Sequence, residues 1–322
     1  MMKKTVILLF ILSVFLCPQS QAFSLRISKQ DKMPTREFIV KIQEKEVREV
    51  ITKQFKFANK HDFENLEKLY SKDFTNSDGF NRDVYFQLIK DTWTTYPDVS
   101  YKTEVRSIDV KPFYASVEVV ETATAAVGGS DKLTEAVNSY GELYIKSRSL
   151  YHLSKQNGEW KIISEDIISE QSSLKFGQAK YIDMEFSTPD VAFAGKEYTS
   201  TLKVDLPDSM SAIAAISQAN ITYPQERGDE KFRNISENKL LQRIFTANKE
   251  NLNEYNVASV AVGRANSENI LMTGAAFIMT RINVVPVNKF VEDVKTVEEK
   301  IKLEEESLKK KLNGEFEGGK IR

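Results

Sequence analysis

The feature that most constrains the fold is a change of hydrophobic period near Pro97. Before it, apolar residues recur every three or four positions, the spacing of amphipathic helices, within 38–58, 62–70 and 81–96. After it, apolar and polar residues alternate, and β-branched and aromatic residues are dense, within 100–110, 113–127, 140–153 and 160–168. Three helices followed by a meander of long antiparallel strands predict the α+β class.

Local signals mark the ends of these segments. Asp62 and Asn81 precede the second and third helical stretches, where each can act as an N-cap. Pro97 ends the third stretch because the residue before a proline avoids helical backbone. Asn157-Gly158 predicts a tight hairpin between the last two strands, since both residue types tolerate positive φ.

Three short motifs in this region together resemble one superfamily. They are a helix–turn–helix junction at 58–66 (Ala-Asn-Lys-His-Asp-Phe-Glu-Asn-Leu), the end of the second helix at 69–74 (Leu-Tyr-Ser-Lys-Asp-Phe) and the last hairpin at 157–163 (Asn-Gly-Glu-Trp-Lys-Ile-Ile). Residues 38–172 resemble the NTF2-like superfamily of the SnoaL or ketosteroid-isomerase type. The resemblance implies a cone, in which three helices pack against a curved antiparallel sheet. We place this domain at 38–176.

The composition changes after Gly177, where strand-like runs are separated by turns. The runs cover 181–186, 199–206, 213–223, 240–248, 255–263 and 272–285. Short strands at regular spacing predict an all-β sandwich over 177–287. The stretch around Tyr255 faintly resembles the tyrosine corner of an immunoglobulin-like strand. Residues 211–218 alternate poorly, so a short helix is the alternative there.

The last segment, 288–322, is rich in both charge signs. Glu298–Lys302 and Glu305–Lys309 are spaced four apart with the acid first, which stabilises a single helix. We expect a charged helical tail, solvated or resting on the sandwich. A coiled-coil oligomerisation helix is the alternative, although few heptads support it.

The first 22 residues carry the pattern of a secretory signal peptide. Lys3 and Lys4 precede an apolar run from Thr5 to Leu16, and Ser20-Gln21-Ala22 forms a small-x-small cleavage site. Large residues before Cys17 argue against lipidation. Residues 23–37 are interpreted as a leader. We therefore expect an exported protein, periplasmic or secreted, with no membrane span after cleavage and no remaining cysteine.

The balance of charged and metal-binding residues excludes several classes of function. The chain has 45 Lys and Arg against 46 Asp and Glu, a net charge of −1, which is atypical of a nucleic-acid binder. Two histidines and one cysteine leave few ligands for a metal, and none is predicted. No glycine-rich nucleotide loop is present, so no cofactor is predicted either.

The lining of the cone is where chemistry is expected. On the strand at 113–127, the parity of Val117, Val119 and Ala123 places Glu121 on the helix-facing side. There it is a candidate general base, since burial would raise its pKa. The alternative, which we favour from sequence, places Glu121 at the solvated rim, because no partner acid or oxyanion donor is evident beside it. The other expected lining residues are Phe55, Trp93 and Tyr151.

The two histidines are weaker candidates. A histidine-based dehydratase or a Ser-His-Asp hydrolase needs one of them inside a pocket. His61 falls in the turn before the second helix, and His152 shares the charged outer face of its strand with Glu142, Lys146 and Arg148. That outer face is expected to meet solvent, the second domain or another copy.

The first functional hypothesis is therefore an exported, non-enzymatic binding or assembly protein of the bacterial envelope, which contacts a protein partner or itself. The alternative is a carrier of a small apolar ligand, or an isomerase- or dehydratase-type enzyme, that uses the cone. Whether the protein is an enzyme is left open, with the absence of a partnered acid favouring a non-enzyme.

Overall fold

The helices expected before Pro97 are present in the computed structural model, which describes residues 36–128, 137, 139–235, 239–265, 270–287 and 302. They are α1 (Arg36–Ala58), α2 (Phe63–Glu67) and α3 (Arg82–Thr95). Both N-caps are confirmed: the carboxylate of Asp62 accepts from the amide of Asn65, and the side chain of Asn81 accepts from the amide of Val84.

The second helix is shorter than the sequence pattern predicted. It ends at Glu67, and Tyr70 begins strand β1 (Tyr70–Asn76), which pairs in parallel with β5 (Glu159–Gly177). The amide of Ile162 in β5 donates to the carbonyl of Leu69. Pairing with a distant strand thus overrides the local helical period, because it satisfies backbone groups that a helix end leaves open.

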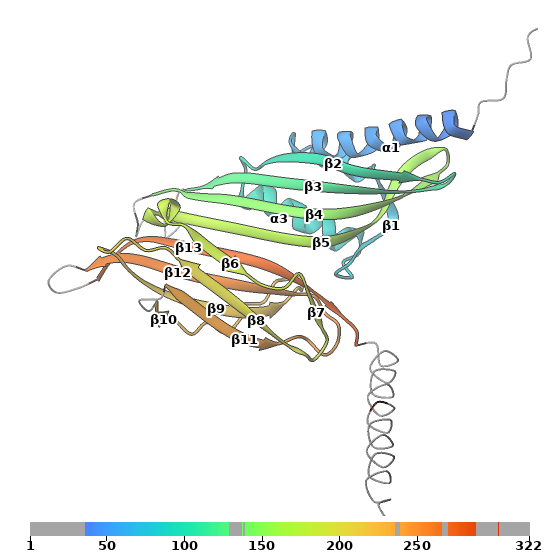
Figure 1. Cartoon of the computed structure of the whole chain (residues 1–322). Helices are drawn as coiled ribbons and strands as arrows, with labels where there is room; N and C mark the ends of the chain where they lie inside the picture. Colours follow the sequence, from blue (N-terminus) through green and yellow to red (C-terminus); the bar gives the residue numbers. More distant parts are fainter. Residues whose placement is uncertain are drawn as a thin grey trace, which may run out of the picture.

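The expected antiparallel meander follows. It comprises β2 (Ser100–Val110), β3 (Tyr114–Val127), β4 (Gly141–Gln156) and β5. Asn157 and Gly158 join β4 to β5 with φ angles of 52° and 86°, as the hairpin signal predicted. Helices α1 and α3 lie on the same side of this sheet (Figure 1). A hydrophobic cluster fills the space between them, with Val47, Ile51, Phe74, Val117, Val119, Leu153 and Ile162 almost fully buried.

All six strands expected after Gly177 are observed within a few residues of their predicted positions. The strands of the second half are β6 (Met184–Ser187), β7 (Val191–Phe193), β8 (Glu197–Val204), β9 (Ser211–Asn220), β10 (Arg233–Asn234), β11 (Leu240–Thr246), β12 (Glu254–Ala265) and β13 (Ile270–Val285), after a short 3-10 helix η1 (Gln178–Tyr181). Strands β7 and β10 were not expected, and the helical alternative for 211–218 is wrong. A second hydrophobic cluster packs around Leu202, Ile216, Ile278 and Ile282.

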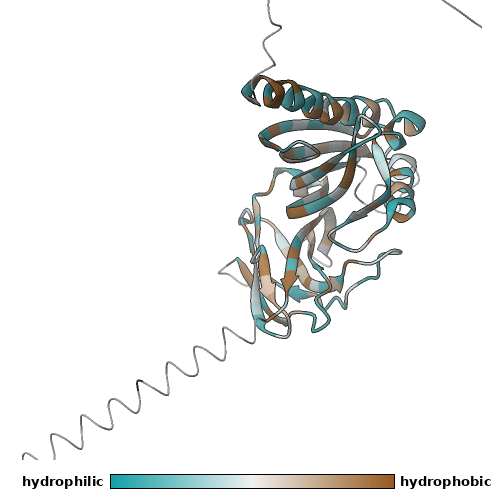
Figure 2. Ribbon diagram, turned by 90° about the vertical axis from the view of Figure 1, so that its right-hand side faces the viewer, coloured by the Kyte–Doolittle hydropathy of each residue, from teal (hydrophilic) through white to brown (hydrophobic). Residues whose placement is uncertain are grey.

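One sheet runs through both halves of the chain. Its strand order is β10-β9-β12-β13-β5-β4-β3-β2, whereas β11, β8 and β6 form a separate three-stranded sheet. The join is the antiparallel pairing of the end of β5 with the middle of β13. One register row crosses seven strands through Lys102, Thr122, Lys146, Gln171, Thr280, Asn256 and Gln218. The side view of Figure 2 shows hydrophobic and hydrophilic residues alternating along these strands, below α1.

Several expectations fall on residues that are not described. The signal peptide (1–22), most of the leader, and the tail from residue 288 onward apart from Lys302 lie outside the described residues. Within the described part of the chain, no helix is both long enough and apolar enough to cross a membrane.

Candidate functional site

A small cavity lies inside the cone, between the helices and the sheet. Its volume is about 90 Å³, room for about three water-sized groups. It is lined by Gln54, Phe55, Ala58, Leu66, Tyr70, Tyr85, Ile89, Trp93, Tyr101, Glu121 and Tyr151. All four cone-lining residues proposed from the sequence, Phe55, Trp93, Glu121 and Tyr151, therefore lie at the wall of one cavity.

Glu121 reaches this wall through the period-two pattern of β3. Val117 and Val119 are fully buried on the same side, and Ala123 is 6% exposed. The hydroxyl of Tyr151, from the neighbouring strand β4, donates to Oε1 of Glu121 at 2.9 Å. Burial, and then the nearby charge of Glu165, raise the pKa of Glu121 to about 8. The carboxyl group is therefore mostly protonated at neutral pH.

A second carboxyl group, which the sequence pattern did not single out, accompanies it. Glu165 of β5 is 5% exposed. Burial raises its pKa, against the opposing effect of the hydroxyl groups of Ser149, Tyr85 and Tyr151. The premise that Glu121 has no acid beside it is thus wrong. Ionising both of two interacting buried carboxyl groups is energetically unfavourable, so the two groups titrate as a pair.

Glu165 was missed because β5 is irregular. Strict alternation from the buried Ile162 would turn Ser164 inward and Glu165 outward. Instead the register shifts between β4 and β5: Leu153 faces Ile162, while the preceding His152 faces Ser164. Ile163 is therefore the extra residue of a β-bulge, and the bulge moves Glu165 to the cavity side. Nothing in the local sequence marks this position.

Tyrosine hydroxyl groups and one amide complete the polar lining. The amide of Gln54 donates to the hydroxyl of Tyr70 at 2.9 Å, and the indole of Trp93 donates to Tyr101 at 3.2 Å. Burial raises the pKa of Tyr70, Tyr85 and Tyr151 well above the usual value, so these phenols stay neutral. The carbonyl oxygen Oε1 of Gln54 has no hydrogen-bond partner, although the residue is 4% exposed.

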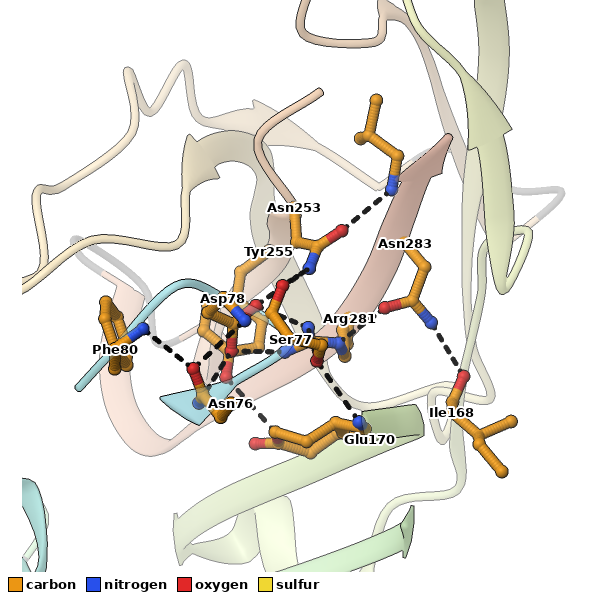
Figure 3. A network of polar contacts seen from close by, with 12 residues as sticks. Asn76, Ser77, Asp78, Phe80, Ile168, Glu170, Asn253, Tyr255, Arg281 and Asn283 are labelled. Carbon is orange, nitrogen blue, oxygen red and sulfur yellow. Dashed lines mark hydrogen bonds and ion pairs between the residues drawn. The ribbon is translucent and has the colours of Figure 1, made fainter. Parts of the chain in front are cut away.

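A polar network fixes the start of α3, the helix that carries Tyr85 and Trp93. The turn after β1 places Asp78 against Arg281 of β13, with both side chains almost fully buried. The side chain of Asn253 donates to Asp78 at 2.8 Å, and Asn76 accepts from the amide of Phe80 at 2.9 Å (Figure 3). These bonds tie the helix that lines the cavity to the second half of the chain. No local sequence pattern marks this network, because Asp78 lies 175 positions from Asn253 and 203 from Arg281.

The histidines lie outside the cavity wall. His61 stacks on Trp93 with ring centroids 4.6 Å apart, and His152 on the outer face contacts Asp166 at 3.0 Å. Among the described residues, no group of three or more His, Cys, Asp or Glu side chains is placed to hold a metal ion. Tyr255, assigned from sequence to a tyrosine corner, donates instead to Oε2 of Glu170 at 3.2 Å.

No protein-family model matches the sequence, and no curated protein matches it. Solved structures do resemble parts of the chain. A putative dehydratase from the NTF2-like family of Streptomyces avermitilis is 12% identical, with a TM-score of 0.32, over 39% of this chain and 96% of that one. ActVI-ORFA from Streptomyces coelicolor is 13% identical, with a TM-score of 0.29, over 39% of this chain and 92% of that one. Bd1075 of Bdellovibrio bacteriovorus is 16% identical (TM-score 0.31), and the match spans 41% of this chain but only 42% of Bd1075.

The arrangement of α1, α2 and α3 against the curved sheet is the cone that the resemblance of residues 38–172 implied. The fold expected from the motifs at 58–66 and 157–163 is thus observed. Identities of 12–16% say nothing about the activity of this domain.

A second depression lies on the outer face of the cone, where its sheet meets β6. Its volume is about 710 Å³, and Arg106, Lys146 and Arg148 are among its lining residues. Strand β6 pairs only with β8 among the described strands. This groove is wide and mixed in charge, because Glu185 and Asp190 line it too. Neither Glu121 nor Glu165 lines this groove.

Proposed function

We propose that the chain is an exported binding protein whose NTF2-like cone holds the polar head of a small ligand. One observation carries the proposal: Glu121, with Glu165 beside it, stands at the wall of a small cavity lined by tyrosine hydroxyl groups. Burying two carboxyl groups costs folding free energy, and such groups concentrate at functional sites. Export rests on the signal-peptide pattern of residues 1–22.

The size of the cavity favours binding over turnover. An isomerase- or dehydratase-type reaction needs a substrate carbon held within reach of the base. A cavity of about 90 Å³ falls short of the ~300–1,000 Å³ of sites that enclose whole ligands. It also argues against a carrier that engulfs a large apolar molecule. A head group of a few heavy atoms fits.

The experiment is a fragment screen by protein-observed NMR, which follows the indole signal of Trp93. Compounds of two to five heavy atoms should shift this signal in the mature protein. Ala58→Met adds bulk at the cavity wall and should abolish the shifts. Ala126→Met, on an exposed part of β3 away from the cavity, is the matched control. If no fragment shifts the signal, the proposal is wrong.

The groove beside β6 favours a second candidate function, a protein contact of the kind expected from the charged outer face. A strand with one unpaired edge can accept another strand, and the groove adjoins that edge. Light scattering would measure the mass of the mature protein, with Arg148→Glu in the groove as the variant. A concentration-dependent dimer that the variant loses supports self-association. A monomer at every concentration excludes it.

A further inference from the structure

The cavity wall is acidic and carries no compensating cation. Its one charged side chain is Glu121, and Glu165 lies next to it. Among the described residues that line the cavity there is no Lys, Arg or His. An anionic ligand would find no cation on this wall to pair with, and it would oppose the ionisation of both acids. A cation would supply the missing counter-charge.

Aromatic rings dominate the remaining wall. They belong to Phe55, Tyr70, Tyr85, Trp93, Tyr101 and Tyr151. The face of such a ring attracts a cation, with tryptophan the strongest, and small ammonium groups are bound in proteins by cages of this composition. The aromatic lining therefore favours an organic cation over a hydrated metal ion.

One unsatisfied acceptor specifies the kind of cation. Oε1 of Gln54 has no partner, although it belongs to a buried side chain on the cavity wall. An acceptor left unpaired in a buried site loses the hydrogen bond that it would make with water. A ligand that carries N–H groups would satisfy both this oxygen and the carboxylate of Glu121. A quaternary ammonium has no N–H to donate.

We propose that the cone binds a small primary or secondary ammonium group, either as a free amine or as the head of a longer molecule. This inference rests on the proposed function and names its ligand class. About 90 Å³ accommodates about three heavy atoms at about 30 Å³ each. Methylammonium is therefore a suitable probe. Like the side chain of lysine, it stays protonated to about pH 10.

Binding should be linked to the ionisation of Glu121. The titratable groups that face this carboxyl group are Tyr101 of β2, Tyr151 of β4, Glu165 and Glu170 of β5, Tyr70 of β1 and Tyr85 of α3. None is cationic, so the free carboxyl group keeps its proton until about pH 8. A bound ammonium stabilises the carboxylate, and the proton leaves. Affinity should therefore rise about tenfold per pH unit below pH 8 and level off above it.

The test is isothermal titration calorimetry of the full mature protein with methylammonium chloride in phosphate buffer between pH 6 and 9. Acetamide is the neutral probe and acetate the anionic one, at matched ionic strength. Glu121→Gln keeps the shape of the side chain and should weaken methylammonium binding at least tenfold above pH 8. Glu118→Gln lies on the opposite face of β3, where its carboxylate contacts Arg148. It should bind like the unmodified protein.

The outcomes separate this inference from the proposed function. If acetamide or acetate binds as tightly as methylammonium, the cone binds ligands but the cation preference is wrong. A pH-independent affinity, or equal binding by Glu121→Gln, also overturns the inference. If none of the three probes, and no other fragment, shifts the Trp93 signal, the proposed function itself fails.

Discussion

Asp78 and Arg281, which lie 203 positions apart, form a buried ion pair that joins the turn before α3 to strand β13. Arg281 is fully buried and the side chain of Asp78 is 3% exposed. Nη1 of Arg281 donates to Oδ2 of Asp78 at 3.0 Å, and Nε donates to Asn283 at 2.8 Å (Figure 3). Tyr85 and Trp93 line the cavity from α3, so this pair connects the second half of the chain to the candidate site.

Removing one partner of the pair should be costly. Arg281→Met leaves the carboxylate of Asp78 buried without a counter-charge, and we expect a loss of about 3–5 kcal/mol in the free energy of unfolding. Arg148→Met is the control, because its partner Glu118 and Arg148 itself are 24% and 51% exposed. That change should cost about 1 kcal/mol or less. Equilibrium urea unfolding measures both, and equal losses would contradict the assignment.

Glu121 should make the stability depend on pH. Its folded pKa of about 8 lies above the ordinary 4.5. The unfolded chain therefore releases this proton at lower pH than the folded one, and raising the pH favours unfolding. The contribution of Glu121 to stability is fully present below pH 4.5 and decreases between pH 4.5 and about pH 8. Above pH 8 the stability no longer changes with the ionisation of this group. A shift of this size corresponds to on the order of 4–5 kcal/mol.

Glu121→Gln removes this ionisation, so its stability relative to the unmodified protein should increase from pH 5 to pH 8. Glu165 and Glu170 also have raised pKa values, so part of the pH dependence remains in the variant. Urea midpoints at pH 5, 7 and 9 provide the measurement. Glu118→Gln serves as control, and parallel curves for the two variants would refute the prediction.

The parts of the fold that depend on local periodicity were predictable. Asp62 and Asn81 cap helices as expected, and Asn157-Gly158 turns β4 into β5. The continuous sheet was not predictable, because the pairing of β5 with β13 joins residues about 100 positions apart. No local pattern encodes such a pairing. Such pairing depends on loop closure and on shared hydrophobic faces rather than on propensity.

The candidate site likewise has one acid that local alternation predicts and one that it does not. Glu121 could be placed inside the cone, because β3 alternates without interruption. Glu165 could not, since the bulge at Ile163 reverses the parity of β5. The favoured position of Glu121 at a solvated rim depended on the apparent lack of a partner acid. The bulge supplies that partner.

Tyr151→Phe tests the hydrogen bond that stabilises the ionised form of Glu121. The Tyr151 hydroxyl lowers the pKa of this carboxyl group, against the effects of burial and Glu165. Its removal should raise the pKa above 8 by about one unit. Carbon-detected NMR of the glutamate carboxyl groups measures the titration. Tyr144→Phe, on the outer face of the same strand, should leave it unchanged, and an unchanged titration in Tyr151→Phe would show that the bond is absent.

The junction of the two halves should be sensitive to one added methyl group. Gly274 of β13 faces Gly177 of β5. A Cβ at Gly274 would lie 2.5 Å from the amide nitrogen of Ala179 and 2.8 Å from the carbonyl oxygen of Phe176. Both neighbours are backbone atoms, so relief requires the strands to separate. Gly274→Ala should cost about 1–3 kcal/mol and speed amide hydrogen exchange at 171–177 and 275–280.

Gly195→Ala provides the comparison for this last change. Its φ of +71° makes alanine unfavourable, but the nearest atom to the added Cβ is Cγ of Lys249 at 3.6 Å. We expect a loss of about 1–2 kcal/mol from backbone strain alone, with exchange at the β5–β13 junction unchanged. Exchange that stays slow at 171–177 in Gly274→Ala would show that the added methyl group leaves the β5–β13 pairing intact, and the prediction would be wrong.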